Sequence, residues 1–161
     1  MPFRYAWPLD RLESRFKFSA DLACGRTLAR LWCAQTPPAE RPTRLIPIPL
    51  HTTRLRQRGY NQALELARPV AAAFGLQLDP RSLLRTRATT AQTTLDRAAR
   101  LRNLRGAFVV RAGTTLPSHV ALLDDVMTTG ATLAAATRAL RLAGVSRVEV
   151  WALARAPAPR G

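Results

Sequence analysis

The stretch VALLDDVMTTGATL, residues 120–133, combines two adjacent carboxylates with a run of small residues, three of which carry hydroxyl groups. Four apolar residues come before Asp124 and Asp125, and they predict a buried strand that has the two acids at its carboxyl end. Because the backbone turns where a strand ends, we expect both carboxylates to face one ligand. The small residues follow directly, ahead of an alanine-rich helical segment: Thr128, Thr129, Gly130, Ala131 and Thr132.

The chemistry of this stretch fits a sugar phosphate. The first amides of a helix have no acceptor within the helix, and the helix dipole favours an anion there, so that the loop is suited to a phosphate. Gly130 allows the backbone to approach such a ligand closely. Two carboxylates would repel a bare phosphate, but they accept hydrogen bonds from the neighbouring hydroxyls of a sugar. The stretch therefore predicts a site for ribose 5-phosphate.

A simpler interpretation is that the acids complement the dipole of the following helix and that the threonines cap it. A cap needs only one such residue, and this stretch has a whole series. Two other phosphate motifs are excluded, since the sequence has neither the Gly-Lys-Ser/Thr ending of a P-loop nor a GxGxxG dinucleotide motif.

The elements that position these residues alternate between strands and helices, which predicts an α/β fold with a parallel sheet flanked by helices. Ligands of such sheets gather at the carboxyl ends of the strands. Strands are expected over residues 44–50, 76–86, 107–110, 120–123 and 147–155. Helices are expected twice within residues 8–34, over 63–74 and 129–143, and as a piece around 95–104. We predict a single domain, with an N-terminal helical segment (1–35), a proline-rich linker (36–43) and a core (44–156).

Two arginine-rich segments are candidates for binding a pyrophosphate. HTTRLRQRGYNQ follows an early strand as an expected loop, and its guanidinium groups match phosphate oxygens; the alternative is a solvated loop. The candidates there are His51, Arg54, Arg58 and Gly59. Residues 81–111 hold eight arginines and one acid, Asp96. A long polar segment of this kind is typical of a lid or a binding loop.

The formal net charge of +15 is carried almost entirely by arginine, because Lys17 is the only lysine. Such a surface attracts phosphates, nucleic acid or anionic lipid, and a merely solvated surface is the alternative. Residues 86–105 contain no aromatic side chain. We therefore expect binding of single-stranded DNA by this segment to be electrostatic, with phosphates contacted and bases left unread.

Cysteine usage and hydropathy predict a cytoplasmic protein. Cys24 and Cys33 fit no zinc spacing and form no disulfide framework, which indicates free thiols in a reducing compartment. Charged residues near the N-terminus exclude the apolar region of a signal peptide, and no stretch approaches about 20 uncharged apolar residues. We expect no membrane insertion.

VALLDDVMTTGAT resembles the phosphoribosyl pyrophosphate (PRPP) motif of type I phosphoribosyltransferases. Together with IPIPLHTTRLRQRGYNQALELA, RTRATTAQTTLDRAARLRNLRGAF and AGVSRVEVWALAR, it is similar to the ComF family, also called ComFC or competence protein F, over residues 8–155. The resemblance implies a type I phosphoribosyltransferase-like fold and, for part of the family, a role in natural transformation. It places the ribose hydroxyls on Asp124 and Asp125, the candidate catalytic residues, the 5-phosphate on residues 128–132 and the pyrophosphate on the loop 49–61.

The same resemblance implies a flexible basic hood loop over PRPP, with Arg85, Gln92, Arg100 and Asn103 on the matching positions. The resemblance also implies that magnesium binds together with PRPP and is held mainly by PRPP itself. No residue is assigned as a zinc ligand. Family members commonly begin with a four-cysteine zinc module. This sequence opens at MPFRYAWPL, where such a module would end, and we expect the module to be absent.

Two functions are therefore compared. The first is a phosphoribosyltransferase that transfers ribosyl phosphate from magnesium-PRPP to a nitrogenous acceptor, which the sequence leaves unidentified. The second is a basic protein that binds single-stranded DNA, in which the PRPP site is regulatory or vestigial. Both are compatible with a connection to natural competence and to the machinery of DNA uptake.

Overall fold

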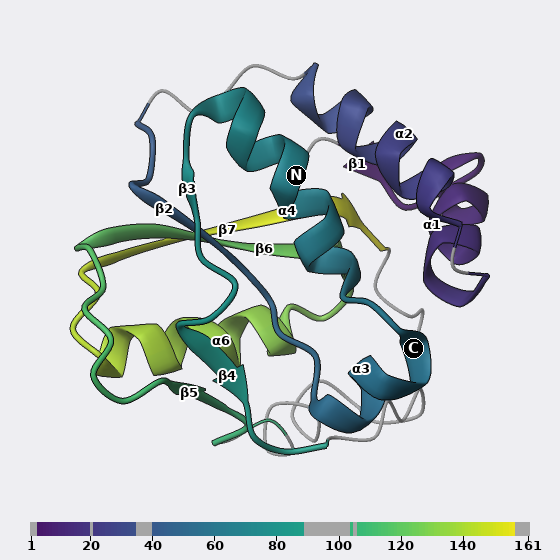
Figure 1. The fold of residues 1–161 in the computed structure, drawn as a ribbon. Helices are drawn as coiled ribbons and strands as arrows, with labels where there is room; N and C mark the ends of the chain where they lie inside the picture. The colour runs from purple at the N-terminus through teal and green to yellow at the C-terminus, as the bar shows by residue number, and fades with distance from the viewer. Residues whose placement is uncertain (1–2, 20, 35–39, 89–103, 105, 157–161) are drawn as a thin grey trace.

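A five-stranded parallel sheet with the order β1-β7-β6-β2-β3 organises the molecule (Figure 1). This computed structural model describes residues 3–19, 21–34, 40–88, 104 and 106–156. The strands are β1 (Phe3–Arg4), β2 (Arg44–Pro47), β3 (Gln77–Leu78), β6 (His119–Met127) and β7 (Arg147–Arg155). The predicted parallel α/β fold is confirmed. Pro47 is the last residue of β2, where its missing amide costs no hydrogen bond within the sheet.

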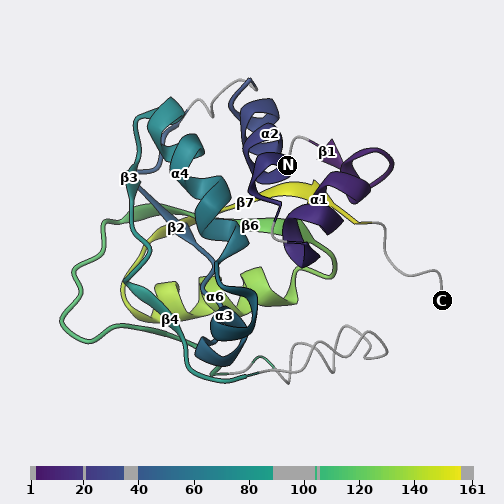
Figure 2. The same ribbon diagram turned by 45° about the vertical axis from the view of Figure 1, so that its right-hand side comes forward.

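Helices cover both faces of this sheet (Figures 1 and 2). Helix α4 (Gln62–Phe74) lies on one face and α6 (Ala131–Leu142) on the other, while α2 (Leu22–Cys33) packs on α4 and α1 (Leu9–Phe18) on α2. The centre of β6 lies between these layers and is fully buried, from Val120 to Leu123. None of the helices in the described ranges is both long and apolar enough to cross a membrane.

The N-terminal segment is joined to the sheet by more than its helices. The two helices expected within residues 8–34 are present as α1 and α2. In addition, β1 pairs with the end of β7, with Phe3 opposite Ala154, which the sequence did not predict because a strand of two residues leaves no pattern. Phe16 of α1 is fully buried against α2, where a Cβ atom on Gly25 would lie 2.4 Å from its ring. These contacts hold α1 in a fixed place beside the sheet.

The segment after β2 is not the loop that the sequence predicted. Thr52–Arg58 form a short helix, α3, which buries no side chain and therefore has no apolar periodicity. Caps define it instead: the Thr53 amide donates to His51 Nδ1 at 3.3 Å, and Gly59 ends the helix with a φ of 83°. The following helix, α4, begins as predicted after Asn61, whose side chain accepts from the Ala63 amide at 3.0 Å.

The single strand predicted over residues 76–86 is also wrong. The chain forms β3, turns, and then forms β4 (Leu83–Arg85), which pairs antiparallel with β5 (Phe108–Val110) in a separate small sheet. Asp79 makes this turn by accepting hydrogen bonds from the amides of Arg81 and Ser82, at 3.1 and 3.0 Å. Residues 89–103, with the helical piece expected around 95–104, lie outside the described residues apart from Leu104.

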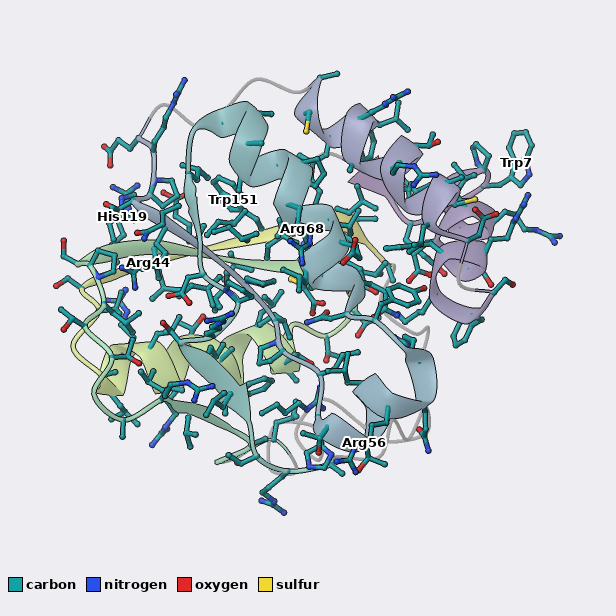
Figure 3. The ribbon with its side chains drawn as sticks, viewed as in Figure 1. Trp7, Arg44, Arg56, Arg68, His119 and Trp151 are labelled. Carbon is teal, nitrogen blue, oxygen red and sulfur yellow. The ribbon has the colours of Figure 1, made fainter. Side chains whose placement is uncertain are left out.

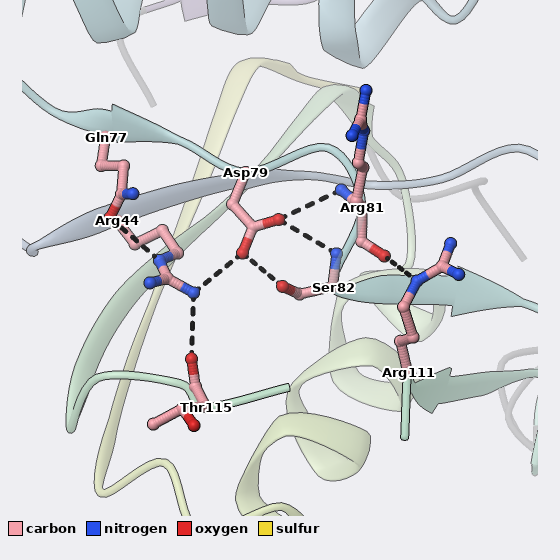
Figure 4. Close-up of polar contacts among 7 residues, drawn as sticks. All are labelled: Arg44, Gln77, Asp79, Arg81, Ser82, Arg111 and Thr115. Atoms are coloured by element: carbon pink, nitrogen blue, oxygen red, sulfur yellow. Dashed lines mark hydrogen bonds and ion pairs between the residues drawn. The ribbon is translucent and has the colours of Figure 1, made fainter. Parts of the chain in front are cut away.

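Asp79 also links the turn to the main sheet (Figure 4). Arg44 of β2 donates to Asp79 Oδ2 at 3.0 Å, to Gln77 Oε1 at 3.3 Å and to the Thr115 carbonyl at 3.2 Å. Burial by itself raises the pKa of Asp79, but hydrogen bonds from Ser82 and Arg81 and the charge of Arg44 outweigh it and hold the pKa below its usual value. This cluster fixes where β4 leaves the sheet.

Replacing Asp79 with Ala should lower the free energy of unfolding by about 2 kcal/mol at pH 7, because Arg44 and two turn amides lose their acceptor. A carboxyl group whose pKa is lower in the folded than in the unfolded protein stabilises the folded state at pH values above the unfolded-state pKa, about 3.9. This contribution is lost as the pH falls through the folded-state pKa. The difference from wild type should therefore shrink below about pH 4. Urea unfolding across pH measures this. Asp10→Ala, in the first turn of α1, is the control, and an equal loss there would contradict the account.

Candidate functional site

Asp124 and Asp125 lie inside β6 and not at its end. The strand continues to Met127 and stays in register with β7, with Asp124 opposite Ala152 and Val126 opposite Ala154. The backbone turn expected at the acids is therefore wrong, and neighbouring strand residues point to opposite faces. Asp125 is buried and lies 3.2 Å from Nζ of Lys17 on α1, whereas Asp124 is half-buried and interacts electrostatically with Arg85 of β4. Each acid thus has its own surroundings.

The two acids also differ in their proton affinity. Burial, followed by the charge of Asp125, raises the pKa of Asp124 well above its usual value. Burial raises the pKa of Asp125 too, but the charge of Lys17 and a hydrogen bond from the Val126 amide outweigh it and lower that pKa. The Asp125 backbone amide donates to Asp124 Oδ1 at 3.0 Å, which holds the Asp124 carboxyl beside the backbone of Asp125. The pair therefore holds one firmly ionised carboxylate beside one that protonates readily.

The segment that follows forms the start of α6. Residues 128–130 connect β6 to the helix, whose first residue is Ala131. Gly130 precedes the helix with a φ of 75°, a conformation that side chains other than glycine rarely adopt. Thr129 Oγ1 accepts from the Ala131 amide at 3.4 Å, but the residue at the cap position is Gly130, and no side chain caps the helix. Thr128 is exposed and Thr132 is half-buried, one on each side of this turn.

Helix α3 brings two of the predicted arginines to a pocket. Arg54 and Arg58 are four residues apart and lie on one face of the helix. They line a pocket of about 410 Å³ together with residues from α1, from α3 itself and from the turn that follows α3: Lys17, Phe18, Gln57 and Tyr60. The Arg58 guanidinium lies 5.9 Å from the centre of the Phe18 ring. The pocket is therefore cationic with aromatic walls.

His51 and Gly59 have structural places at the two ends of α3. His51 caps its first turn, and Gly59 ends it. Neither residue is part of the pocket lining, and Arg56 of the same helix is exposed outside it (Figure 3). Figure 3 also shows Arg44 and His119, the first residues of β2 and β6, on the opposite side of the molecule from Arg56. The pocket thus lies toward the carboxyl ends of the strands.

Of the four residues predicted for the hood loop, the structure describes Arg85. It lies half-buried in β4, with its guanidinium 5.4 Å from the centre of the Phe108 ring. Burial and the nearby charge of Arg54 lower the pKa of Arg85, and Asp124 acts in the opposite direction. Arg85 therefore belongs to the same group of charges as α3 and the acid pair. Gln92, Arg100 and Asn103 lie outside the described residues.

Comparisons with known proteins agree with this architecture. No protein-family model matches the chain. The DNA utilization protein YhgH of Escherichia coli is 36% identical over 160 residues, covering 94% of this chain and 69% of that protein. Competence protein F of Haemophilus influenzae is 38% identical over 160 residues, covering 94% of this chain and 70% of the relative. The chain belongs to the competence protein F family.

Another member of the competence protein F family, competence protein ComFC of Streptococcus pneumoniae, is 31% identical over 153 residues, covering 95% of this chain and 66% of the relative. Among solved structures, glutamine PRPP amidotransferase from B. subtilis, in complex with ADP and GMP, matches with a TM-score of 0.53 and 18% identity. The match covers 80% of this chain and 26% of that one. It shows that this chain has the type I phosphoribosyltransferase fold.

Sequence reasoning missed Lys17, Phe18 and Tyr60. The structure places all three beside the predicted pyrophosphate arginines, and it places Lys17 against Asp125. Phe18 has no motif around it that indicates a site, whereas Tyr60 lies within the predicted pyrophosphate loop 49–61 but was not singled out. Lys17 did carry one signal, because it is the only lysine among 25 basic residues, but only the packing of α1 shows what it contacts.

Gly130→Val should lower the free energy of unfolding by about 1 to 2 kcal/mol, because a β-branched residue resists a positive φ. Ribose 5-phosphate, the ligand that the sequence predicts, is expected to raise the melting temperature of the wild type, and Gly130→Val should remove this rise because its side chain blocks the approach to the α6 amides. Gly144→Val is the matched control: Gly144 has a φ of 92° but follows the far end of α6. This control should lose similar stability and keep the ligand-dependent rise. Equal protection of both variants would exclude the loop as the phosphate site.

Proposed function

We propose that this chain binds magnesium-PRPP, or ribose 5-phosphate, at the carboxyl end of β6 and serves the handling of DNA in natural competence. The observation that supports the ligand is the acid pair in β6, followed within a few residues by a positive-φ glycine at the start of α6. Carboxylates accept hydrogen bonds from ribose hydroxyls, and the first amides of α6 suit a phosphate. Both halves of the predicted site are thus present in one connected segment.

The pyrophosphate would bind on the other side of the acid pair. Arg54 and Arg58 line the pocket of about 410 Å³, and Arg85 adds a third guanidinium near Asp124. One guanidinium group can donate two parallel hydrogen bonds to the oxygens of a phosphate, and it keeps its charge at any physiological pH. The positive charge of these arginines offsets the negative charge of the ligand. Without the arginines, the two carboxylates would repel this ligand.

Magnesium would enter with the ligand. The candidate site has two carboxylates, and Lys17 already neutralises Asp125. Magnesium keeps several water molecules and takes substrate phosphates as ligands, so it does not need a cage formed by the protein. Bound to PRPP, it would supply charge neutralisation at the pyrophosphate, while Arg54 and Arg58 orient that group.

A transferase reaction is compatible with this arrangement. Pyrophosphate would leave from C1 of the ribose, and a nitrogenous acceptor would take the ribosyl phosphate. The residues present would act by positioning and by stabilising charge, since three cations, Lys17, Arg54 and Arg58, line the pocket and Lys17 contacts the Asp125 carboxylate. Release of pyrophosphate from PRPP in the presence of nucleobases or of DNA distinguishes turnover from binding alone.

The relatives support the biological context. They are named for competence and for DNA utilization, and their matches cover nearly the whole of this chain. The net charge of +15 adds a second candidate function, in which the chain binds single-stranded DNA and the PRPP site is regulatory or vestigial. In both cases the chain would work together with the machinery of DNA uptake.

Replacing both acids, Asp124→Asn with Asp125→Asn, should abolish PRPP binding, because neutral amides offer weaker acceptors and leave Lys17 without its partner on β6. Isothermal titration calorimetry with magnesium and PRPP measures the affinity, and a thermal melt checks the fold. Asp10→Asn with Glu65→Gln removes the same charge from helix positions outside the site and should leave the affinity unchanged. An unaltered affinity in a folded Asp124/Asp125 variant would overturn the assignment of the ribose.

The DNA hypothesis predicts binding to single-stranded DNA that weakens steeply with salt and depends little on sequence. Changing Arg97, Arg100, Arg102 and Arg105 together to Gln should flatten the plot of log affinity against log salt by about 0.7 for each phosphate that the variant no longer neutralises. These four residues lie outside the described ranges. Fluorescence titration at several salt concentrations gives the slope.

The control for this titration removes four exposed arginines from helices: Arg26, Arg30, Arg68 and Arg138. It has the same net charge as the first variant and should keep the wild-type slope. An equal change in both variants would indicate a diffuse charge effect, and an unchanged slope in the first would move the DNA site elsewhere. If wild-type protein binds no DNA at low salt, the second candidate function is excluded.

A further inference from the structure

The only lysine of the chain joins the N-terminal helix to the acid pair. Lys17 lies near the end of α1, and its Nζ atom is 3.1 Å from Glu13 Oε1 and 3.2 Å from Asp125 Oδ2. Its side chain is 28% exposed, against 3% for Glu13 and 11% for Asp125. The ammonium group is therefore held between two buried carboxylates that come from different elements.

This ion pair continues into a buried polar chain. Tyr5, the residue after β1, donates its hydroxyl to Glu13 Oε2 at 3.2 Å, and its amide donates to the Arg155 carbonyl at 2.9 Å. Three separate elements, β6, α1 and the extension of β1, thus meet at Lys17 and Glu13. Removing such charges from water costs free energy, and their mutual attraction often does not fully offset this cost. Apolar side chains at the same positions would often stabilise the fold at least as much. Stability alone does not account for the arrangement.

We propose that Lys17 is a positioning residue of the candidate sugar-phosphate site: it fixes the Asp125 carboxylate in its charged form and thereby makes α1 a working part of that site. The proposal rests on the proposed function for its effect on the ligand, but the hold on Asp125 exists in the free protein. Asp125 is thereby kept as a hydrogen-bond acceptor in one orientation.

Electrostatics support this role. Without a cation, the negative charge of each carboxyl group would disfavour ionisation of the other, because like charges in a poorly solvated place repel each other. The charge of Lys17 outweighs burial and lowers the pKa of Asp125, while burial and the charge of Asp125 raise that of Asp124. The other groups that interact electrostatically with these acids or with Lys17 come from the residue after β1, from α1, from the turn between α3 and α4, and from β4: Tyr5, Glu13, Tyr60 and Arg85.

Lys17 is also shared between the acid pair and the cationic pocket. It lines the pocket of about 410 Å³ together with Arg54 and Arg58, so a ligand that spans the pocket and the acids would pass this ammonium group. An arginine at position 17 would keep the charge, whereas a methionine of similar length would not. These two variants separate the charge of the side chain from its size.

The first test follows the carboxyl carbons of labelled aspartates by NMR across pH in the free protein, with Asp125→Asn used to assign the signal. In Lys17→Met the titration midpoint of the Asp125 carboxyl group should rise by about one pH unit or more, and in Lys17→Arg it should return to the wild-type value. Arg15→Met is the matched control, since Arg15 lies on the same helix but pairs with Asp21 at the surface. An unchanged midpoint in a folded Lys17→Met variant would overturn the proposal.

If Lys17→Met does not fold, the same NMR titration is made on the double variant Lys17→Met with Glu13→Gln. The second substitution removes the buried Glu13 carboxylate, which would otherwise be left without its cation. Asp125 remains unpaired in this double variant, and its midpoint should rise as in the single one. A wild-type midpoint in the folded double variant would likewise overturn the proposal.

The second test measures ribose 5-phosphate binding by calorimetry between pH 5 and 8. The pH below which affinity falls should move upward in Lys17→Met, and it should return in Lys17→Arg and stay in place in Arg15→Met. A profile that does not move, despite a shifted Asp125 midpoint, would overturn the positioning role. If wild-type protein does not bind ribose 5-phosphate at all, the proposed function is wrong. The NMR titration in the free protein still decides separately whether Lys17 holds Asp125 in its charged form.

Discussion

Burial of β6 on both faces is the constraint on which the remaining structure depends. This strand pairs with β2 on one side and β7 on the other, and helices α4 and α6 cover its two faces. Its centre, from Val120 to Leu123, is fully buried, so that polar groups are excluded until the strand nears its end. The first polar side chains after this apolar run, those of Asp124 and Asp125, therefore lie in the second half of the strand, toward the end at which parallel strands place their ligands.

Carboxyl groups at such a place need opposite charge, and the structure supplies it from several elements. Lys17 of α1 contacts Asp125 directly, while Arg85 of β4 acts on Asp124 from the other side of the sheet. Arg54 and Arg58 of α3 complete a group of cations around the end of β6. Since these cations come from three different parts of the chain, the surroundings of the acid pair exist only when these parts have packed together.

The N-terminal segment has a larger part in this arrangement than its helical pattern indicates. It adds β1 to the sheet, packs Phe16 into the core and brings Lys17 and Phe18 to the cationic pocket. The relatives match the chain over 94% of its length, and this match takes in the N-terminal helices as well as the sheet. The fold is shared with part of glutamine PRPP amidotransferase.

The sequence by itself determined the parallel sheet, the N-terminal helices, the cap at Asn61 and the segment 120–133 as a candidate site. Each of these features depends on local patterns: apolar runs, cap residues and neighbours in the chain. The short helix α3 and the separate β4–β5 sheet were not predicted, because α3 buries no side chain and β4 depends on a turn held by Arg44 from another strand. The partners of the two acids were decided by tertiary structure alone. Lys17 and Asp125 are more than a hundred residues apart, and only the packing of α1 beside the sheet brings their charges within 3.2 Å.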